Sequence, residues 1–213
     1  HNPTGITTPQ THREALLRTA EEYEVPIVED GFEEEMKYFG KAVLPIKSMD
    51  RRGIVLYVGT FSKVLFPGVR VGWIAGDRAA LSQLTTLQKF SHLAGSSVEQ
   101  AALNLYCRKG FYENHIKRMH RVYRRRMQTA LDSLSDQLEG APVYWTQPAG
   151  GYTLWLHMRD ENRQETEVLR SLARQGVLVT PGRFHYADGS LGVSFRISIG
   201  AVDEESIREG IRR

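Results

Sequence analysis

The chain has 213 residues, of which 41% are hydrophobic and 25% are charged, and 28 Lys and Arg against 25 Asp and Glu give a formal net charge of +3. This composition excludes a disordered or fibrous protein, and so small an excess of positive charge does not indicate a nucleic-acid binder. The single cysteine, Cys107, excludes an internal disulfide and a metal cluster built from cysteines, and the longest apolar run, 54–58, is far too short to span a bilayer. We therefore expect a cytoplasmic protein without a membrane partner.

The first half of the chain predicts strands that end in polar residues. Thr8, which a proline follows, predicts the N-cap of a helix over 9–23. Apolar runs predict three strands, over 25–28, 54–58 and 70–75. Two further helices are expected between 78 and 107. In open α/β sheets of this kind, ligands bind at the carboxyl ends of the strands.

The second half predicts a small α+β layer that follows one long helix. Apolar residues at helical spacing from Ile116 to Leu138 predict a helix over 111–139. Beyond that helix, apolar runs and turn residues predict strands over 143–145, 151–158, 177–180 and 193–199, and helices near 164–174 and 203–212. The chain therefore changes from an open α/β pattern to an α+β pattern at about the start of the long helix.

Four polar groups of residues stand out against this pattern of elements. They are Asn2-Pro3-Thr4-Gly5, Asp30, Thr60-x-Ser62-Lys63 together with Arg70, and Arg196. Taken singly, each has an ordinary explanation: a turn, a helix cap, a solvent-exposed lysine, or an arginine in a salt bridge. Their combination and their order along the chain favour a functional site.

Five segments of the chain resemble the class I and II aminotransferases, which are fold-type I enzymes that depend on pyridoxal 5′-phosphate. These segments are HNPTG at 1–5, VEDGF at 28–32, GTFSKVLFPGVRVGW at 59–73, PAGGYTLWL at 148–156 and FRISIG at 195–200. The resemblance implies an α/β fold of the fold-type I transferase kind. Residues 1–108 would be the C-terminal part of the large, mixed-sheet cofactor domain, and 109–213 the interdomain helix and the small C-terminal α+β domain.

The resemblance also implies the two catalytic residues. Lys63 matches the lysine that forms a Schiff base with the cofactor aldehyde and then moves a proton from the substrate Cα. Asp30 matches the carboxylate that holds the protonated ring nitrogen of the cofactor, which allows the ring to accept electrons. The implied reaction is the transfer of an amino group between an amino acid and a 2-oxo acid.

Further binding roles follow from the same resemblance. Asn2 would donate to the 3′ oxygen of the cofactor, and Arg196, with Asn2, would bind the α-carboxylate of the substrate. The cofactor phosphate would be held by Thr60, Ser62 and Arg70. No metal is implied. Where many relatives carry a tyrosine soon after the aspartate, this chain has Phe32, which cannot donate a hydrogen bond.

A second resemblance leaves the function open between an enzyme and a regulator. The basic run 115–127 and the form of the lysine motif are similar to the aminotransferase-like domain of GntR/MocR transcriptional regulators and to 2-aminoadipate-type aminotransferases. In the regulators this domain senses pyridoxal phosphate or an amino compound, and DNA is bound through an upstream winged-helix module. The arginines of the run are themselves typical of the solvated face of a helix.

The start of the chain, HNPTG, resembles a segment from the middle of the family's catalytic unit. We therefore expect the chain to be the C-terminal portion of a larger protein that forms a homodimer. The sequence does not indicate which amino acid is the substrate.

Overall fold

Two separate β-sheets organise the chain in the computed structural model, which describes residues 1–159, 163–187 and 192–213. The chain divides into two units, each with one sheet. The Lys63 unit consists of residues 8–36 and 41–118, and the Arg196 unit consists of residues 1–7, 37–40 and 119–213. Each unit is described by itself below.

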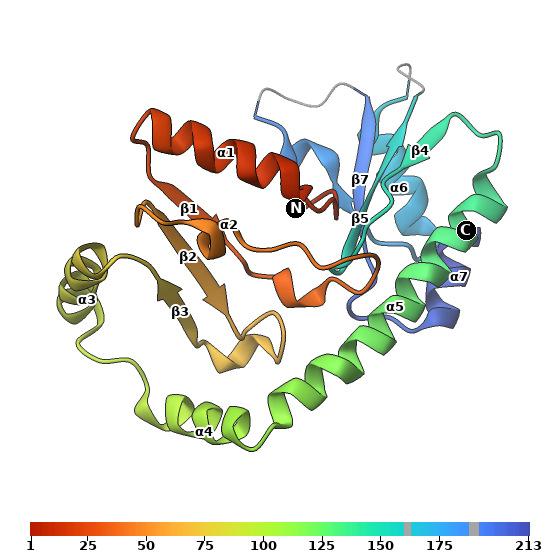
Figure 1. Cartoon of the computed structure of the whole chain (residues 1–213). Coiled ribbons are helices and arrows are strands. Elements are labelled where there is room, and N and C mark those ends of the chain that lie inside the picture. Colours follow the sequence, from red (N-terminus) through yellow and green to blue (C-terminus); the bar gives the residue numbers. More distant parts are fainter. Residues whose placement is uncertain (160–162, 188–191) are drawn as a thin grey trace. The chain divides into compact units, whose positions relative to one another are not determined.

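The sheet of the Lys63 unit has the strand order β1-β2-β3 (Figure 1). Its strands are β1 (Ile27–Asp30), β2 (Val55–Thr60) and β3 (Gly72–Ala75). β1 and β2 are parallel, so their carboxyl ends lie at one edge of the sheet, whereas β3 is antiparallel to β2. This arrangement brings the ends of the first two strands, both rich in polar residues, to the same edge.

Helices cover one face of this sheet. Leu17 of α1 (Gln10–Glu22) and Ile46 of α2 (Ile46–Met49) pack with Val55 of β2 in a buried cluster. The unit continues through the short helices η1 (Glu34–Met36) and η2 (Pro67–Val69) and then α3 (Arg78–His92) and α4 (Ser97–Arg108). The helices expected near the start of the chain and between 78 and 107 are therefore confirmed.

The start of the first helix and the start of the first strand both differ from the prediction. The N-cap of α1 is Pro9, without a side-chain cap bond, so the expected cap at Thr8 is wrong. At the other end, Glu24 adopts a left-handed conformation with φ 54°, and the Val25 amide donates to the Ala20 carbonyl at 2.9 Å. Because this closure of the helix consumes the Val25 amide, the strand begins two residues later than expected, at Ile27.

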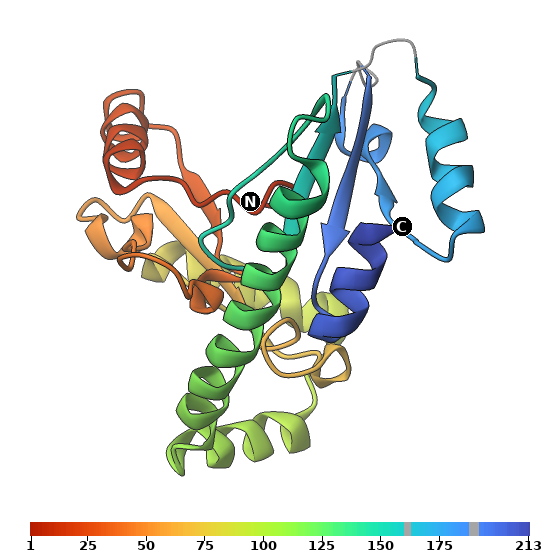
Figure 2. The ribbon, with the colours of Figure 1, turned by 90° about the vertical axis from the view of Figure 1, so that its right-hand side faces the viewer.

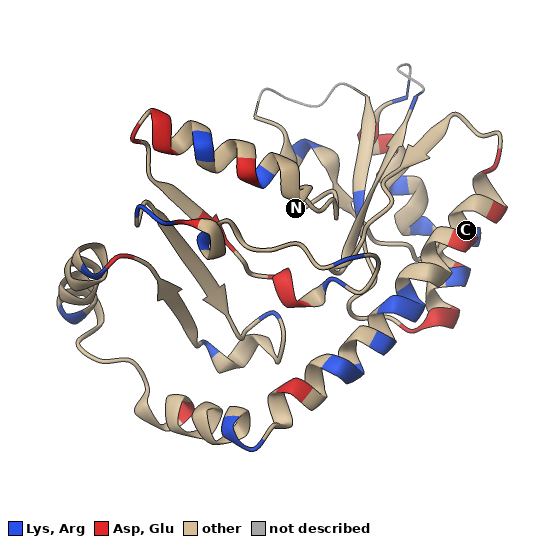
Figure 3. Cartoon of the chain, viewed as in Figure 1, with Lys and Arg blue, Asp and Glu red and all other residues tan. Residues whose placement is uncertain are grey.

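One long helix, α5 (Phe111–Leu138), runs from the end of the Lys63 unit into the Arg196 unit. Its apolar stripe buries Met127, Ala130 and Leu134 against the second sheet. Its other positions carry a series of basic side chains along the helix (Figure 3). The helix and its stripe agree with the prediction.

The Arg196 unit is built on an antiparallel sheet with the strand order β4-β5-β7-β6. The strands are β4 (Val143–Trp145), β5 (Thr153–Met158), β6 (Thr180–Pro181) and β7 (Val193–Ser198). Figure 2 shows α7 (Glu204–Arg212) beside this sheet, where Ile207 joins the core. Val168 and Leu172 of α6 (Glu165–Arg174) pack against the same core. A short helix, η3 (Gly182–His185), follows β6. This is the small α+β layer that the sequence predicts, but the strand expected over 177–180 is wrong in its bounds, since β6 is only Thr180–Pro181.

Within the residues that the structure describes, no helix is both long and apolar enough to cross a membrane.

Candidate functional site

Asp30 ends the first strand of the Lys63 unit. It is exposed, and its Oδ1 accepts a hydrogen bond from the Phe32 amide at 3.2 Å, so the turn that follows the strand holds its carboxylate. Its partner in the parallel register is Val58 of β2. The strand ladder continues one residue further, because the Gly31 amide donates to the Val58 carbonyl at 2.9 Å.

Thr60 and Ser62 organise the start of the loop after β2. Thr60 is the last residue of the strand and pairs with Gly72, and its Oγ1 accepts a hydrogen bond from the Ser62 amide at 3.1 Å. The same hydroxyl lies 3.5 Å from the Val71 carbonyl, to which it donates. Ser62 is buried, with 7% of its surface exposed. The turn that carries both hydroxyls is therefore held by the hydrogen bonds of the Thr60 side chain.

Lys63 lies in a tight turn that a helix supports from outside. The amides of Val64 and Leu65 donate to the Phe61 carbonyl at 3.3 and 2.9 Å, which closes the turn around the exposed lysine. The Nε2 atom of His115, near the start of α5, lies 2.9 Å from the Val64 carbonyl and donates to it. The lysine is therefore presented by a fixed loop rather than by a free one.

Arg70 adopts a backbone conformation that is uncommon for a residue with a side chain. Its φ of 44° and ψ of 31° are left-handed, and it follows directly on η2. Such a conformation costs about 1–2 kcal/mol for a residue other than glycine, and residues of this kind cluster at ligand sites. The exposed guanidinium is presented from this turn.

The parallel register brings Asp30 and Thr60 to one face of one sheet edge. Asp30 aligns with Val58, and Thr60 lies two residues beyond Val58, so both side chains leave the same face of the sheet. The loops that carry Ser62 and Lys63 begin at this edge. The sheet thus collects a carboxylate, two hydroxyls and an amine, and Arg70 adds a guanidinium just before β3.

The remaining two predicted residues meet each other in the Arg196 unit. Arg196 lies on β7, and its Nη1 donates to the Asn2 Oδ1 at 2.9 Å. Its Nη2 donates to the Thr180 Oγ1 at 3.2 Å, and its Nε is buried without a hydrogen-bond partner in the described part of the chain. A buried donor without a partner is costly, so the guanidinium is suited to an additional anionic or carbonyl acceptor.

His185 lies near Arg196 and has no role in the predicted site. Partial desolvation by its neighbours, followed by the positive charge of Arg196, lowers the pKa of His185, and its ring packs on Trp155 with the ring centres 5.6 Å apart. An imidazole with a lowered pKa stays neutral at pH 7, and so it adds no second positive charge beside the arginine.

The structure therefore gathers the predicted residues in two groups, one in each unit. Asp30, Thr60, Ser62, Lys63 and Arg70 belong to the Lys63 unit, and Asn2 and Arg196 to the Arg196 unit. The sequence reasoning missed His115 and Thr180, which contact these groups from elements distant in sequence. No local pattern marks either of them, since a histidine on a helix or a threonine before a proline is common.

Comparisons with known proteins show the family of the chain. The family model of the aminotransferases of class I and II matches residues 1–213. Aromatic-amino-acid aminotransferase 1 of Thermococcus litoralis is 34% identical over 212 residues, which cover 100% of this chain and 50% of that protein. The uncharacterized HTH-type transcriptional regulator YisV of Bacillus subtilis is 29% identical over 212 residues, 100% of this chain and 43% of the regulator.

A solved structure shows the same fold. The α-aminoadipate aminotransferase LysN from Thermus thermophilus, complexed with N-(5′-phosphopyridoxyl)-L-leucine, matches with a TM-score of 0.90 and 32% identity. The match covers 99% of this chain and 54% of that one. The chain thus spans about half the length of the relatives that it matches.

Proposed function

Because the chain belongs to the aminotransferases of class I and II, we propose that it carries the reactive lysine of a pyridoxal phosphate-dependent aminotransferase. The observation that carries this proposal is the set of side chains on the Lys63 unit. An exposed lysine in a fixed turn and an aspartate at the adjacent strand end are the two groups that this chemistry requires.

The chemistry of the donors fits pyridoxal 5′-phosphate. A phosphate calls for hydroxyl and guanidinium donors, which Thr60, Ser62 and Arg70 supply. An aldehyde calls for an amine, which is Lys63, and a protonated ring nitrogen calls for a carboxylate, which is Asp30. Asn2 has an amide that would donate to the ring oxygen. When bound, the cofactor supplies a ring that accepts the electrons left on the substrate Cα.

Each catalytic residue then has one task. Lys63 removes the proton from the substrate Cα and returns a proton later in the cycle, as a base held in a fixed turn. Asp30 keeps the proton on the ring nitrogen through its negative charge. Arg196 orients the substrate by pairing with its α-carboxylate, for which the planar fork of an arginine is well matched. Phe32, two residues after Asp30, donates nothing from its side chain.

The substrates that we propose are an amino acid and a 2-oxo acid. The position of Arg196 serves any α-amino acid, so the side-chain preference of the enzyme stays open. We further propose a cytoplasmic homodimer in which residues 1–108 are part of the large cofactor domain and residues 109–213 the interdomain helix and small domain.

A regulator is the second candidate function. The similarity to YisV over the whole of this chain supports it. In that case the same residues would bind pyridoxal phosphate or its adduct with an amino compound, and DNA would be bound only through an upstream module. The residues of the two predicted groups are common to both functions.

A half-reaction experiment on the full-length protein separates the two candidates. Pyridoxal phosphate is added, and the visible absorbance is followed through successive additions of an amino acid and of a 2-oxo acid. Loss of the band with the amino acid and its recovery with the 2-oxo acid would support the enzyme. A spectral change without turnover, together with a change in DNA affinity, would support the regulator. A band retained in Lys63→Ala, with exposed Lys89→Ala as the matched control, would overturn the role of Lys63.

A further inference from the structure

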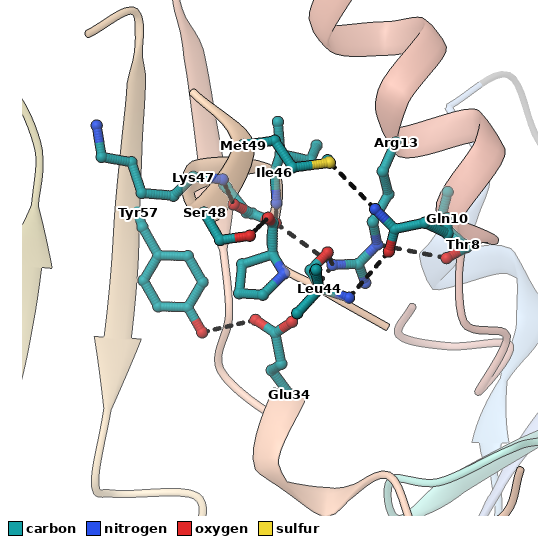
Figure 4. A network of polar contacts seen from close by, with 12 residues as sticks. Thr8, Gln10, Arg13, Glu34, Leu44, Ile46, Lys47, Ser48, Met49 and Tyr57 are labelled. Atoms are coloured by element: carbon teal, nitrogen blue, oxygen red, sulfur yellow. Dashed lines mark hydrogen bonds and ion pairs between the residues drawn. The ribbon is translucent and has the colours of Figure 1, made fainter. Parts of the chain in front are cut away.

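A network of polar contacts joins Glu34, four residues after Asp30, to neighbouring elements of the Lys63 unit; Figure 4 shows its members Arg13, Glu34 and Tyr57. The Tyr57 hydroxyl donates to the Glu34 Oε2 at 2.7 Å, and the Glu34 Oε1 lies 3.3 Å from the Arg13 Nη1. The same Nη1 lies 3.5 Å from the Glu29 Oε1 and donates to the Leu44 carbonyl at 3.1 Å. The four side chains come from α1, β1, η1 and β2, so the network connects four elements of the Lys63 unit.

These charges are largely removed from solvent and are paired. The side chains of Arg13, Glu29 and Glu34 are 15%, 10% and 21% exposed. Both oxygens of Glu29 also accept backbone hydrogen bonds at 2.8 Å, from Ile46 and Lys47. Charges are costly to bury, and breaking one of these ion pairs would leave an uncompensated charge and strongly destabilise the fold. The network is therefore held in one geometry.

The Tyr57 hydroxyl lies close against Gly31, the residue that follows Asp30. A Cβ placed on Gly31 would lie 1.9 Å from the Tyr57 hydroxyl oxygen, so only glycine leaves room for the phenol at this position. Burial, the hydrogen bond to Glu34 and the nearby carboxylates raise the pKa of Tyr57, so the hydroxyl keeps its proton and remains a donor at neutral pH.

Two hydrogen bonds within the turn connect this contact to the Asp30 carboxylate. The Glu34 amide donates to the Gly31 carbonyl at 3.2 Å, which closes the turn that Tyr57 holds. Inside this turn the Phe32 amide donates to the Asp30 Oδ1 at 3.2 Å. The network therefore fixes one end of a five-residue turn, and the aspartate stands at the other end.

We propose that Tyr57 and Glu34, tied to Arg13, are positioning residues that fix the Asp30 carboxylate through the turn over residues 30–34. The purpose of that carboxylate rests on the proposed function, but its fixation does not depend on the cofactor. Neither residue touches a substrate in this proposal. Their effect passes through the backbone of Gly31 and Phe32.

The first test measures the turn itself, in the full-length protein without added cofactor. Tyr57→Phe removes only the hydroxyl and keeps the ring that stacks on Trp73. We expect the Phe32 amide to exchange with deuterium about tenfold faster in this variant, the effect of losing one hydrogen bond to a charged group. Tyr23→Phe, at an exposed tyrosine of the same unit, should leave this exchange unchanged. Glu34→Gln keeps an acceptor for the phenol but removes the charge that pairs with Arg13, so the Phe32 amide should exchange at least as fast as in Tyr57→Phe.

The second test asks whether Tyr57 acts through Asp30, by measuring the dissociation constant for pyridoxal phosphate in a double-mutant cycle. Tyr57→Phe should weaken binding about tenfold when Asp30 is present and less than about twofold in the Asp30→Ala background. A general loss of structure would instead give the same factor in both backgrounds.

Each outcome decides one of the two proposals. Unchanged exchange at Phe32 in Tyr57→Phe, or an equal loss of affinity in both backgrounds, would overturn the positioning role. If Asp30→Ala alone leaves the affinity for pyridoxal phosphate unchanged, the cofactor role of Asp30 fails, and the exchange of the Phe32 amide then decides the positioning role by itself.

Discussion

Asp50 offers a quantitative test of how the strand that leads to the lysine is anchored. Its side chain is completely buried just before β2, where it pairs with the Lys47 ammonium at 2.8 Å. It also accepts four backbone hydrogen bonds at 2.8–3.3 Å, from the amides of Arg52, Gly53, Ile54 and Val55. One carboxylate therefore closes the turn from which the strand starts. Asp50→Asn removes the charge while nearly keeping the shape.

The pKa of Asp50 sets the size of the effect. Burial by itself raises the pKa, but the hydrogen bonds from Lys47 and from the backbone amides outweigh it, and the pKa falls from 3.8 to about 2. At about 1.4 kcal/mol for each pH unit, this difference contributes about 2 kcal/mol to the free energy of unfolding. Because the pKa is lower in the folded state, the contribution is complete above pH 5 and is lost as the pH falls through 4 toward 2.

Urea denaturation of the wild type and of Asp50→Asn between pH 7 and pH 2.5 measures this contribution. We expect the variant to be less stable by at least about 2 kcal/mol at pH 6, and the difference to shrink by most of that amount near pH 2.5. Asp136→Asn, at an exposed position of α5, should show neither effect. A difference that stays constant over the whole pH range would refute the claim that the ionised carboxylate anchors the strand.

Substitutions at three further positions test other parts of the structure and of the proposed sites. Gly59→Ala should lower the stability of the protein by about 1–3 kcal/mol in thermal denaturation, because its Cβ would lie 2.3 Å from the Trp73 ring; a neutral result would mean that the tryptophan moves freely. Arg196→Lys should raise the KM for the amino acid about tenfold to a hundredfold in steady-state kinetics and leave cofactor affinity intact, and a loss of cofactor alone would contradict this. His115→Leu should weaken pyridoxal phosphate binding about fivefold through the lost bond to the Val64 carbonyl, and His115→Gln should restore it; equal affinities in the two variants would argue against that bond.

Patterns that depend on neighbouring residues could be predicted from the sequence. The stripe from Ile116 to Leu138 predicted the long helix, and its buried members Met127 and Leu134 confirm it. The polar ends of two apolar runs predicted that Asp30 and Thr60 lie at one sheet edge, and the parallel register confirms this too. In both cases the side-chain period along the chain carries the information.

Features that depend on contacts between distant residues could not be predicted. The hydrogen bond between Tyr57 and Glu34 joins residues 23 positions apart, and Arg13 reaches Glu34 over 21 positions. Glu29 offered a weak signal, since a charged residue inside a short strand needs a partner. The sequence did not show where that partner was. The start of β1 was missed because the cap of the preceding helix consumed the Val25 amide, which propensity alone does not reveal.

The central claim is that Lys63 bonds covalently to the cofactor, and borohydride trapping tests it most directly. The full-length protein is incubated with pyridoxal phosphate, reduced with sodium borohydride and digested, and the labelled peptide is identified by mass spectrometry. We expect the phosphopyridoxyl group on Lys63 of the wild type and no such label in folded Lys63→Ala. A label on another lysine, or no label in a folded wild-type protein, would contradict it.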